Sequence, residues 1–429
     1  MVREVAAPGP ARRPRGRRAQ ILAVAARQFH RSGYHQVALA EVAAAVGITA
    51  PALYRHFRGK PELLHQAVRT GLEELGRAVA RAAAASAGRP AEAPRALARA
   101  LARVALEQRA LGTLWQRDAR LLPAAQLAAL RRGLRADVRA AARLLTGADP
   151  ELTSSEAELM VWSALSACGS LSYHTFAPPR RRFEQLLYEL VSALFEARSE
   201  TRCEPAGAAP GAVPGMLPQA RPVNRREELL VAAVRLFHEH GFDNVSIDRL
   251  GAAVGIAGPS VYKHFPTKAE LLDAALVRCR DRLWHEVGAA VGSAADPGAA
   301  LDLGLAAYVD FARRHHHYLG AMVSETDRLP EPERKAALDF RRDFLRVWVG
   351  LLRQLRPGYD QAEARIRVHA MFALVNDGVR NRPYANRPDL AAARPDLAAA
   401  LDRLARAVLG LPARAGAGTD PEGTAPAPG

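Results

Sequence analysis

Cysteine is scarce in this chain, and long apolar runs are absent. The 429 residues include only Cys168, Cys203 and Cys279, which lie too far apart for a zinc-binding spacing or a redox motif. No run of about 18 apolar residues occurs, and no secretory signal pattern is present. We therefore expect a protein in the reducing cytoplasm, without membrane contact, metal or cofactor.

The motifs that usually mark an enzyme are also missing. The sequence has no nucleophile elbow, no phosphate-binding loop and no paired-carboxylate motif. Three consecutive histidines at 315–317 suggest a metal site. Consecutive side chains on a helix point in different directions, however, so these three cannot easily chelate one ion. We expect a solvated helix end at these histidines and a protein that is not an enzyme.

Acidic residues and lysines are both few. The chain has 44 acidic and 60 basic residues, for a net charge of +16. This excess favours a polyanionic partner, nucleic acid first, although a composition rich in arginine from genome bias accounts for part of it. Only four residues are lysine, and Lys60, Lys263 and Lys268 all fall within a repeated block. A compact ammonium group in an arginine-rich chain suggests a specific geometric role.

That block occurs twice, with an offset of 208 residues. Its matching segments are 29–34 with 237–242, 45–48 with 253–256, and 51–57 with 259–265. Weaker matches continue at 111–112 with 319–320, and Gly169 resembles Gly378 at an offset of 209. A whole unit of roughly 200 residues was therefore duplicated, a length that suits one DNA-binding part and one larger core per unit.

Helical periodicity dominates both units, so the predicted fold class is all-α. The first unit begins with helices at about 17–32, 39–46 and 49–56. Gly33 ends the first helix, and Gly47 makes the sharp turn of a helix-turn-helix. Thr49 caps the third helix. In the second unit Ser246 caps the second helix, and Thr267 opens a capping box at the fourth.

The repeated block resembles the tetracycline-repressor-like (TetR/AcrR) family. The similarity rests on Gly-aromatic, Val-Gly-Ile and Leu/Val-Tyr-x-His-Phe-x-x-Lys-x-x-Leu-Leu, which stand at 33–34, 46–48 and 53–64 and return at 241–242, 254–256 and 261–272. It covers about 50 residues of each unit, and Val37 and Val245 replace the usual Thr or Ser before the second helix. The resemblance implies two tandem units, each with a helix-turn-helix domain followed by a helical ligand-binding and dimerisation bundle.

The third helix of each unit is the expected recognition helix in the major groove. Arg55 or Lys263 can reach guanine, and the resemblance implies phosphate contacts for Tyr54 and Tyr262. The full set of expected DNA contacts is Arg17, Arg18, Thr49, Ala50, Pro51, Tyr54, Arg55, His56 and Lys60, with Arg225, Arg226, Gly258, Pro259, Ser260, Tyr262, Lys263, His264 and Lys268. The alternatives are core packing for Tyr54, helix-end packing for the histidines and a non-specific electrostatic arm for the N-terminal arginines.

The resemblance also implies a small-molecule pocket in each bundle. Candidate lining residues are Trp115, Trp162, Tyr173, His174 and Phe176 in the first unit, and Tyr308, Phe311, Tyr318, Trp348, Phe372 and Asn376 in the second. Aromatic residues at helical spacing are more often plain core, which is the alternative for each.

The expected domain boundaries follow from these patterns. They are a disordered basic arm at 1–16, DNA-binding domains at 17–62 and 224–270, ligand and dimerisation domains at 63–199 and 271–411, a linker at 200–223 and a disordered tail at 412–429. We refer to residues 17–199 as the first unit and to residues 224–411 as the second.

The sequence thus predicts a DNA-binding transcriptional regulator, foremost a repressor that a small-molecule effector releases from a double-stranded operator. The two units are expected to pair within one chain, with Ala164, Gly169, Ala193, Ala373, Gly378 and Ala398 allowing close approach. A linker of about 24 residues reaches roughly 80 Å, against roughly 35 Å between adjacent half-sites. The alternatives are an activator, a DNA-binding protein of low specificity, a homodimer with one idle DNA-binding domain, and a ligand sensor.

Overall fold

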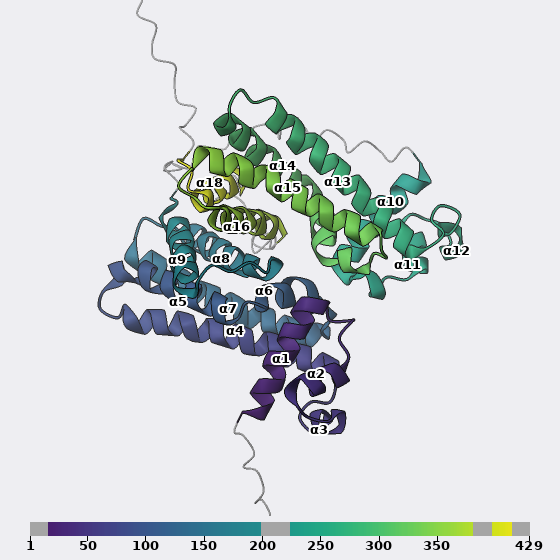
Figure 1. Cartoon of the computed structure of the whole chain (residues 1–429), viewed down its shortest axis with the longest axis horizontal. Coiled ribbons are helices and arrows are strands. Elements are labelled where there is room, and N and C mark those ends of the chain that lie inside the picture. The colour runs from purple at the N-terminus through teal and green to yellow at the C-terminus, as the bar shows by residue number, and fades with distance from the viewer. Residues whose placement is uncertain (1–15, 199–223, 381–396, 414–429) are drawn as a thin grey trace, which may run out of the picture.

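The computed structural model describes residues 16–198, 224–380 and 397–413. Every regular element in these ranges is helical, which confirms the all-α prediction (Figure 1). The predicted linker, and nearly all of the predicted arm and tail, lie outside the described residues. None of the helices in the described ranges is long and apolar enough to cross a membrane.

The first predicted DNA-binding domain is built from α1 (Arg17–Ser32), α2 (Leu39–Val46) and α3 (Ala50–Tyr54). Gly47 follows α2 with φ 73°, a left-handed conformation that glycine adopts without strain, and so makes the sharp turn into α3. The Thr49 hydroxyl accepts a hydrogen bond from the Ala52 amide at 3.4 Å, as expected of the cap. The third helix is shorter than the predicted 49–56, because the chain turns after Tyr54 to bury Phe57.

The bundle of the first unit follows without a break. Its elements are α4 (Lys60–Ala85), η1 (Pro90–Glu92), α5 (Ala93–Glu107), α6 (Leu111–Thr113), η2 (Leu114–Asp118), η3 (Ala119–Leu121), α7 (Ala124–Ala148), α8 (Ser154–Gly169), η4 (Ser170–Tyr173) and α9 (Arg180–Glu196). Closest packing occurs at Gly112, where a Cβ atom would lie 2.2 Å from the Gly169 carbonyl oxygen. Glycine is therefore required there, and it lets α6 pack against the end of α8.

The second unit repeats this order with fewer breaks. Its elements are α10 (Arg225–His240), η5 (Phe242–Asn244), α11 (Ile247–Ala253), α12 (Gly258–Val261), α13 (Lys268–Gly292), α14 (Pro297–Ser324), η6 (Thr326–Arg328), α15 (Glu333–Leu355), α16 (Gln361–Arg380) and α18 (Leu397–Leu409). Ser246 and Thr267 cap α11 and α13 as predicted. The expectation of a solvated end at 315–317 is wrong: these half-buried histidines lie inside α14, at a kink where His315 is non-helical.

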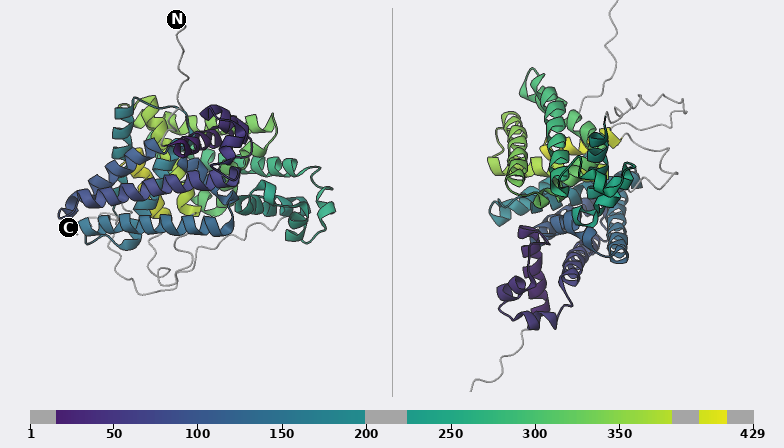
Figure 2. Two further views of the ribbon diagram at one scale, coloured as in Figure 1. Left: turned by 90° about the horizontal axis from the view of Figure 1, so that it is seen from below. Right: turned by 90° about the vertical axis from the view of Figure 1, so that its right-hand side faces the viewer.

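The two units pack against each other within the chain. Helices α8 and α9 contact α16 and α18, and Figures 1 and 2 show the two halves of the colour scale meeting along this face. Ala164 and Ala373 are buried. The expected role of the two glycines differs, however, because a Cβ atom on Gly169 would meet Gly112 and one on Gly378 would meet Leu401, each in its own unit.

The caps at the start of the second helix allow a reciprocal test. Ser246 accepts the Arg249 amide at 3.1 Å, whereas the matching position in the first unit is Ala38, whose amide donates to Glu41 at 3.2 Å. We predict that Ser246→Ala lowers the free energy of unfolding by about 1 kcal/mol and that Ala38→Ser raises it. Urea unfolding monitored by circular dichroism measures both. A change of the same sign in the free energy of unfolding of both variants would contradict the prediction.

Candidate nucleic-acid interface and effector cavity

The recognition helices expose the side chains that the sequence assigns to DNA. Tyr54 is 54% exposed and Tyr262 is 51% exposed, although both follow directly on buried core positions. Arg55 and Lys263 are exposed beside them. Core packing, the alternative for Tyr54, is therefore wrong, whereas Phe57 and Phe265 are buried as core residues. DNA contact by the tyrosines remains a prediction.

The two recognition surfaces differ in what they offer to a base. In the first unit Thr49 and Pro51 are exposed and Ala50 is half-buried. In the second unit Gly258 is buried, because a Cβ atom there would collide with Asp248 of α11. In the same unit Pro259 is exposed, and Ser260 and His264 are half-buried. His56, the counterpart of His264 in the first unit, is also half-buried. The second surface thus presents fewer side chains to a groove.

Lys60 and Lys268 have a structural role that the sequence did not reveal. The Lys60 ammonium donates to the His35 carbonyl at 3.1 Å and lies over the Tyr34 ring. Lys268 donates to the carbonyls of Phe242 and Val245 at 2.8 and 3.1 Å. Burial lowers the pKa of both lysines. They hold the loop between the first two helices of each DNA-binding domain. Their contact with phosphate stays a prediction.

The arginines at the start of each unit also have partners within their own domain. Arg17 donates to the Val46 carbonyl and Arg225 to the Val254 carbonyl, each at the end of the second helix. Arg18 and Arg226 lie over the rings of Phe57 and Phe265, both at 4.4 Å. These contacts match at an offset of 208, so each DNA-binding domain is stabilised by the same pair of arginines. The four arginines therefore do not form a loose electrostatic arm, which was the alternative for those at the N-terminus.

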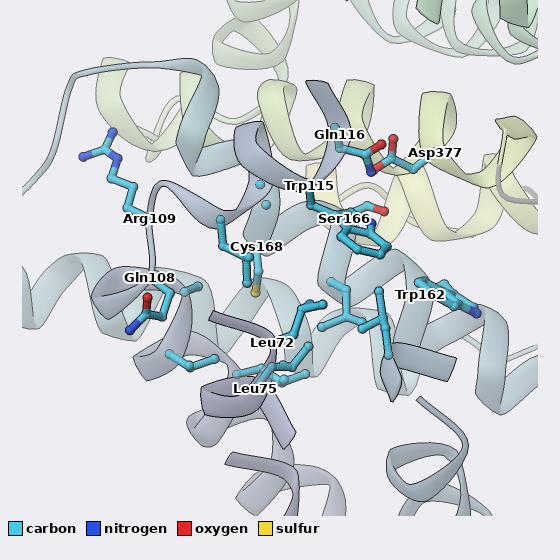
Figure 3. A pocket seen from close by; sticks show the side chains of 18 of the residues that line it. Leu72, Leu75, Gln108, Arg109, Trp115, Gln116, Trp162, Ser166, Cys168 and Asp377 are labelled. Carbon is cyan, nitrogen blue, oxygen red and sulfur yellow. The ribbon is translucent and has the colours of Figure 1, made fainter. Parts of the chain in front are cut away.

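A cavity of about 100 Å³ lies in the bundle of the first unit (Figure 3). Trp115, Trp162 and Tyr173 line it together with leucines of α4 and α5. That these three side chains contact a small molecule stays a prediction. Figure 3 shows Gln116 beside Asp377 at one end and Gln108 and Arg109 at the other. Asp377 belongs to α16 of the second unit, so the two units share this wall. His174 and Phe176 stack against each other outside the cavity lining.

The predicted pocket residues of the second unit pack against one another. The rings of Tyr308, Trp348 and Phe372 lie 4.9–6.0 Å apart, and Phe344 joins them. Tyr308 donates to the Asn376 side chain at 2.8 Å, and Phe311 is buried beside His315. At an offset of 208 Tyr308 stands where the first unit has Ala100, so the second unit carries a ring where the first carries a methyl group. In the described structure these side chains form core, which was the stated alternative.

A network of charged groups at the junction of the units escaped the sequence analysis. Arg120 of the first unit donates to the Phe237 carbonyl at 3.2 Å and forms an ion pair with Glu325, which is 1% exposed. Arg117 pairs with Asp327 across the junction at 3.1 Å. The 208 offset carried the signal, because it aligns Arg117 with Glu325 and so marks a reversal of charge between the copies.

A buried histidine, His174, and a half-buried one, His369, also meet between the units. His174 and His369 lie 5.0 Å apart, and Arg109 and Arg365 are nearby. Burial lowers the pKa of His174 to about 2 and that of His369 to about 3, with the neighbouring guanidinium groups acting in the same direction. His238, at the junction of α10 and α14, is similarly lowered to about 3 by burial. All three rings are therefore neutral at ordinary pH.

A family model described as "Bacterial regulatory proteins, tetR family" matches residues 21–67 and 229–275. The transcriptional repressor KstR2 of Mycobacterium tuberculosis is 30% identical over 156 residues, which cover 36% of this chain and 77% of that protein. The transcriptional activator FasR of Mycolicibacterium smegmatis is 27% identical over 164 residues, covering 38% and 74%. The solved structure of M. tuberculosis KstR2 matches with 25% identity and a TM-score of 0.37, covering 44% of this chain and 94% of that one.

The three histidines with lowered pKa predict that acid destabilises the fold. Above pH 6.5 they are neutral in both the folded and the unfolded chain. Below that value the unfolded chain takes up protons that the folded chain does not, so stability falls as pH falls. We expect a lower melting temperature at pH 5.5 than at pH 7.5, and a weaker dependence in His369→Gln.

The matched control for this titration is His285→Gln, since His285 is exposed on α13. This variant should keep the full pH dependence of the parent protein. A melting temperature of the parent that does not fall between pH 7.5 and pH 5.5 would contradict the prediction.

Proposed function

We propose that the two DNA-binding domains of this chain, which belongs to the tetR family of DNA-binding transcriptional regulators, bind one operator together. In this proposal the units of a single chain form an internal pseudo-dimer in the cytoplasm. A small molecule that enters the cavity of the first unit releases the DNA, so that the protein acts as a repressor. The observation that carries the proposal is the contact of α8 and α9 with α16 and α18.

The charges at the junction support pairing within the chain. Arg120 contacts Glu325, and Glu325 occupies the position that Arg117 holds in the first unit. If two copies of the first unit paired in the same geometry, Arg120 would face Arg117 of the other copy. Like charges brought together away from water are costly, so the substitution favours pairing of unlike units.

Further ion pairs and hydrogen bonds join the same two faces. Arg182 on α9 pairs with Asp360 at 2.5 Å, and Arg403 on α18 donates to the Ala197 carbonyl at 3.3 Å. Gln116 donates to Asp377 at 2.8 Å. Because the units are tethered, these contacts form at the high effective concentration of an intramolecular reaction.

The unequal recognition surfaces favour an operator without two-fold symmetry. The first unit presents Thr49 and Arg55, whose counterparts at the 208 offset are Ala257 and Lys263. The second unit carries Ser260 where the first has Ala52. Arginine can contact guanine O6 and N7 with two parallel hydrogen bonds, whereas lysine acts as a point charge. We propose that the half-site bound by the first unit has the stricter sequence requirement.

The direction of regulation has two candidates, because the relatives include a named repressor and a named activator. We favour the repressor because an effector cavity that borders both units can couple occupancy to the placement of the two DNA-binding domains. A DNA-binding protein of low specificity remains the alternative that the net charge of +16 supports. Such a protein would bind all sequences similarly at any salt concentration.

The proposal is tested by selection of bound sequences from a random DNA pool, followed by native mass measurement of the complex with the selected DNA. We expect an asymmetric site held by one chain. A palindrome held by two chains would replace the pseudo-dimer with a homodimer in which one domain is idle. Failure to enrich any sequence would overturn specific operator binding.

The two exposed tyrosines give a test at single residues. We predict that Tyr54→Phe and Tyr262→Phe each weaken binding to the selected DNA by about tenfold, since a hydrogen bond to a charged phosphate contributes roughly 1.5–3 kcal/mol. The melting temperature should stay unchanged, because both hydroxyl groups lie on exposed side chains. Fluorescence anisotropy titration measures the affinity.

Tyr188→Phe is the matched control for these variants, because Tyr188 lies on α9, where Arg99 of the bundle covers its ring. It should bind DNA as tightly as the parent protein. If both recognition-helix variants also bound as tightly, the assignment of the tyrosines to phosphate contact would be refuted.

A further inference from the structure

We propose that the segment Leu114–Leu121, formed by η2 and η3, couples the first-unit cavity lined by Trp115 and Trp162 to both DNA-binding domains. Two side chains of the segment line the cavity. A third side chain contacts the first DNA-binding domain, and a fourth contacts the second. One effector molecule per chain would then control two domains. This inference rests on the proposed function for its biological meaning, but its structural content can be tested without DNA.

The segment reaches the cavity through Trp115 and Gln116. Both side chains line it, and Figure 3 shows Gln116 beside Asp377. The Gln116 amide donates to Asp377 at 2.8 Å, and its oxygen accepts from Arg380 at 3.3 Å. A molecule that entered the cavity would therefore press on a side chain already bonded to α16 of the second unit.

The next residue, Arg117, turns to the first DNA-binding domain. Its guanidinium donates to the Phe29 carbonyl at 2.7 Å, in the last turn of α1. Asp118 holds the same guanidinium from within the segment at 2.8 and 3.1 Å. The Arg117 side chain is only 14% exposed, so it cannot move far without moving the end of α1.

Three residues later, Arg120 contacts the second DNA-binding domain. It donates to the Phe237 carbonyl at 3.2 Å, in the last turn of α10. Phe237 matches Phe29 at the 208 offset, so Arg117 and Arg120 hold equivalent carbonyl groups of the two domains. The Arg120 Nε atom also donates to the Arg117 carbonyl at 2.9 Å, which ties the two arginines to one backbone segment.

The second unit has no matching set in the described part of the chain. At the 208 offset Trp115, Gln116 and Arg117 become Val323, Ser324 and Glu325. Arg328, the counterpart of Arg120, pairs with Asp243 of its own unit. The aromatic side chains of the second unit meanwhile pack against one another. The coupling is thus one-sided: the first unit carries the cavity and both arginine contacts.

The test measures the distance between the two DNA-binding domains in the full-length chain. Ala44 on α2 and Ala252 on α11 are exposed and match at the 208 offset. We would change both to cysteine in a Cys203→Ser background, since Cys168 and Cys279 are buried. Nitroxide labels at these two sites then report the distance distribution by double electron–electron resonance. Circular dichroism confirms the fold of each variant.

Two variants perturb the segment, and each has a matched control. Trp115→Ala opens the cavity from the segment, whereas Trp162→Ala opens it from α8. Arg120→Gln removes the contact with α10, whereas Arg314→Gln removes ion pairs with Glu286 and Asp310 inside the bundle of the second unit. Arg120→Lys keeps the charge and should shift the distance less than Arg120→Gln does.

We expect Trp115→Ala and Arg120→Gln to broaden the distribution and move its mean by about 2 Å, the scale of helix shifts in switching proteins. The two controls should keep the parent distribution. Parent-like distances in Trp115→Ala or Arg120→Gln would overturn the proposal, as would equal shifts in the controls. Because no DNA is used, a distance response supports the coupling even if sequence selection fails and the proposed function is rejected.

Discussion

The packing of α8 and α9 against α16 and α18 is the constraint on which the rest of the structure depends. It holds two bundles together, places Asp377 at the cavity wall of the other unit, and brings Arg120 within reach of α10. Further contacts join the units beside it, because Arg117 pairs with Asp327 and His35 of the first DNA-binding domain lies 3.4 Å from Asp243 of the second. The tether raises the effective concentration of the two faces, and their complementary charges select the geometry.

Duplication gave the chain two copies of one fold, and the two copies have since diverged in sequence. The positions that build the DNA-binding domain are kept in both copies: lysine over an aromatic ring, arginine over phenylalanine, and glycine after the first helix. Divergence is concentrated in the bundles. Ala100 and Tyr308 occupy matching positions, and so do Arg117 and Glu325, so the copies differ in side-chain volume and in the charge that they bring to the junction.

Local features of the fold could be predicted from the sequence, and contacts between distant residues could not. The bounds of α1 and α2 match the predicted 17–32 and 39–46, because Gly33, Gly47 and the hydrophobic spacing act within a few residues. Trp115 and Trp162 were placed at the cavity through the family resemblance. By contrast, the acceptors of Lys60 and Lys268 lie about 25 residues away, and nothing in the local pattern specifies them. The junction pairs join residues about 200 positions apart, where only the offset between copies held a clue.

The buried charges at the junction are better explained by specificity than by stability. Arg120 is 16% exposed and Glu325 is 1% exposed, while Arg380 and Asp377 are 12% and 6% exposed. Removing such pairs from water costs about as much as their attraction returns, so a leucine contact would stabilise the junction at least as well. Apolar contacts, unlike hydrogen bonds, would not fix the relative orientation of the two units. An arginine that bonds a helix-end carbonyl and a carboxylate together fixes one orientation of α10 relative to the first unit. The charges therefore set which faces pair, and at what angle the second DNA-binding domain is held.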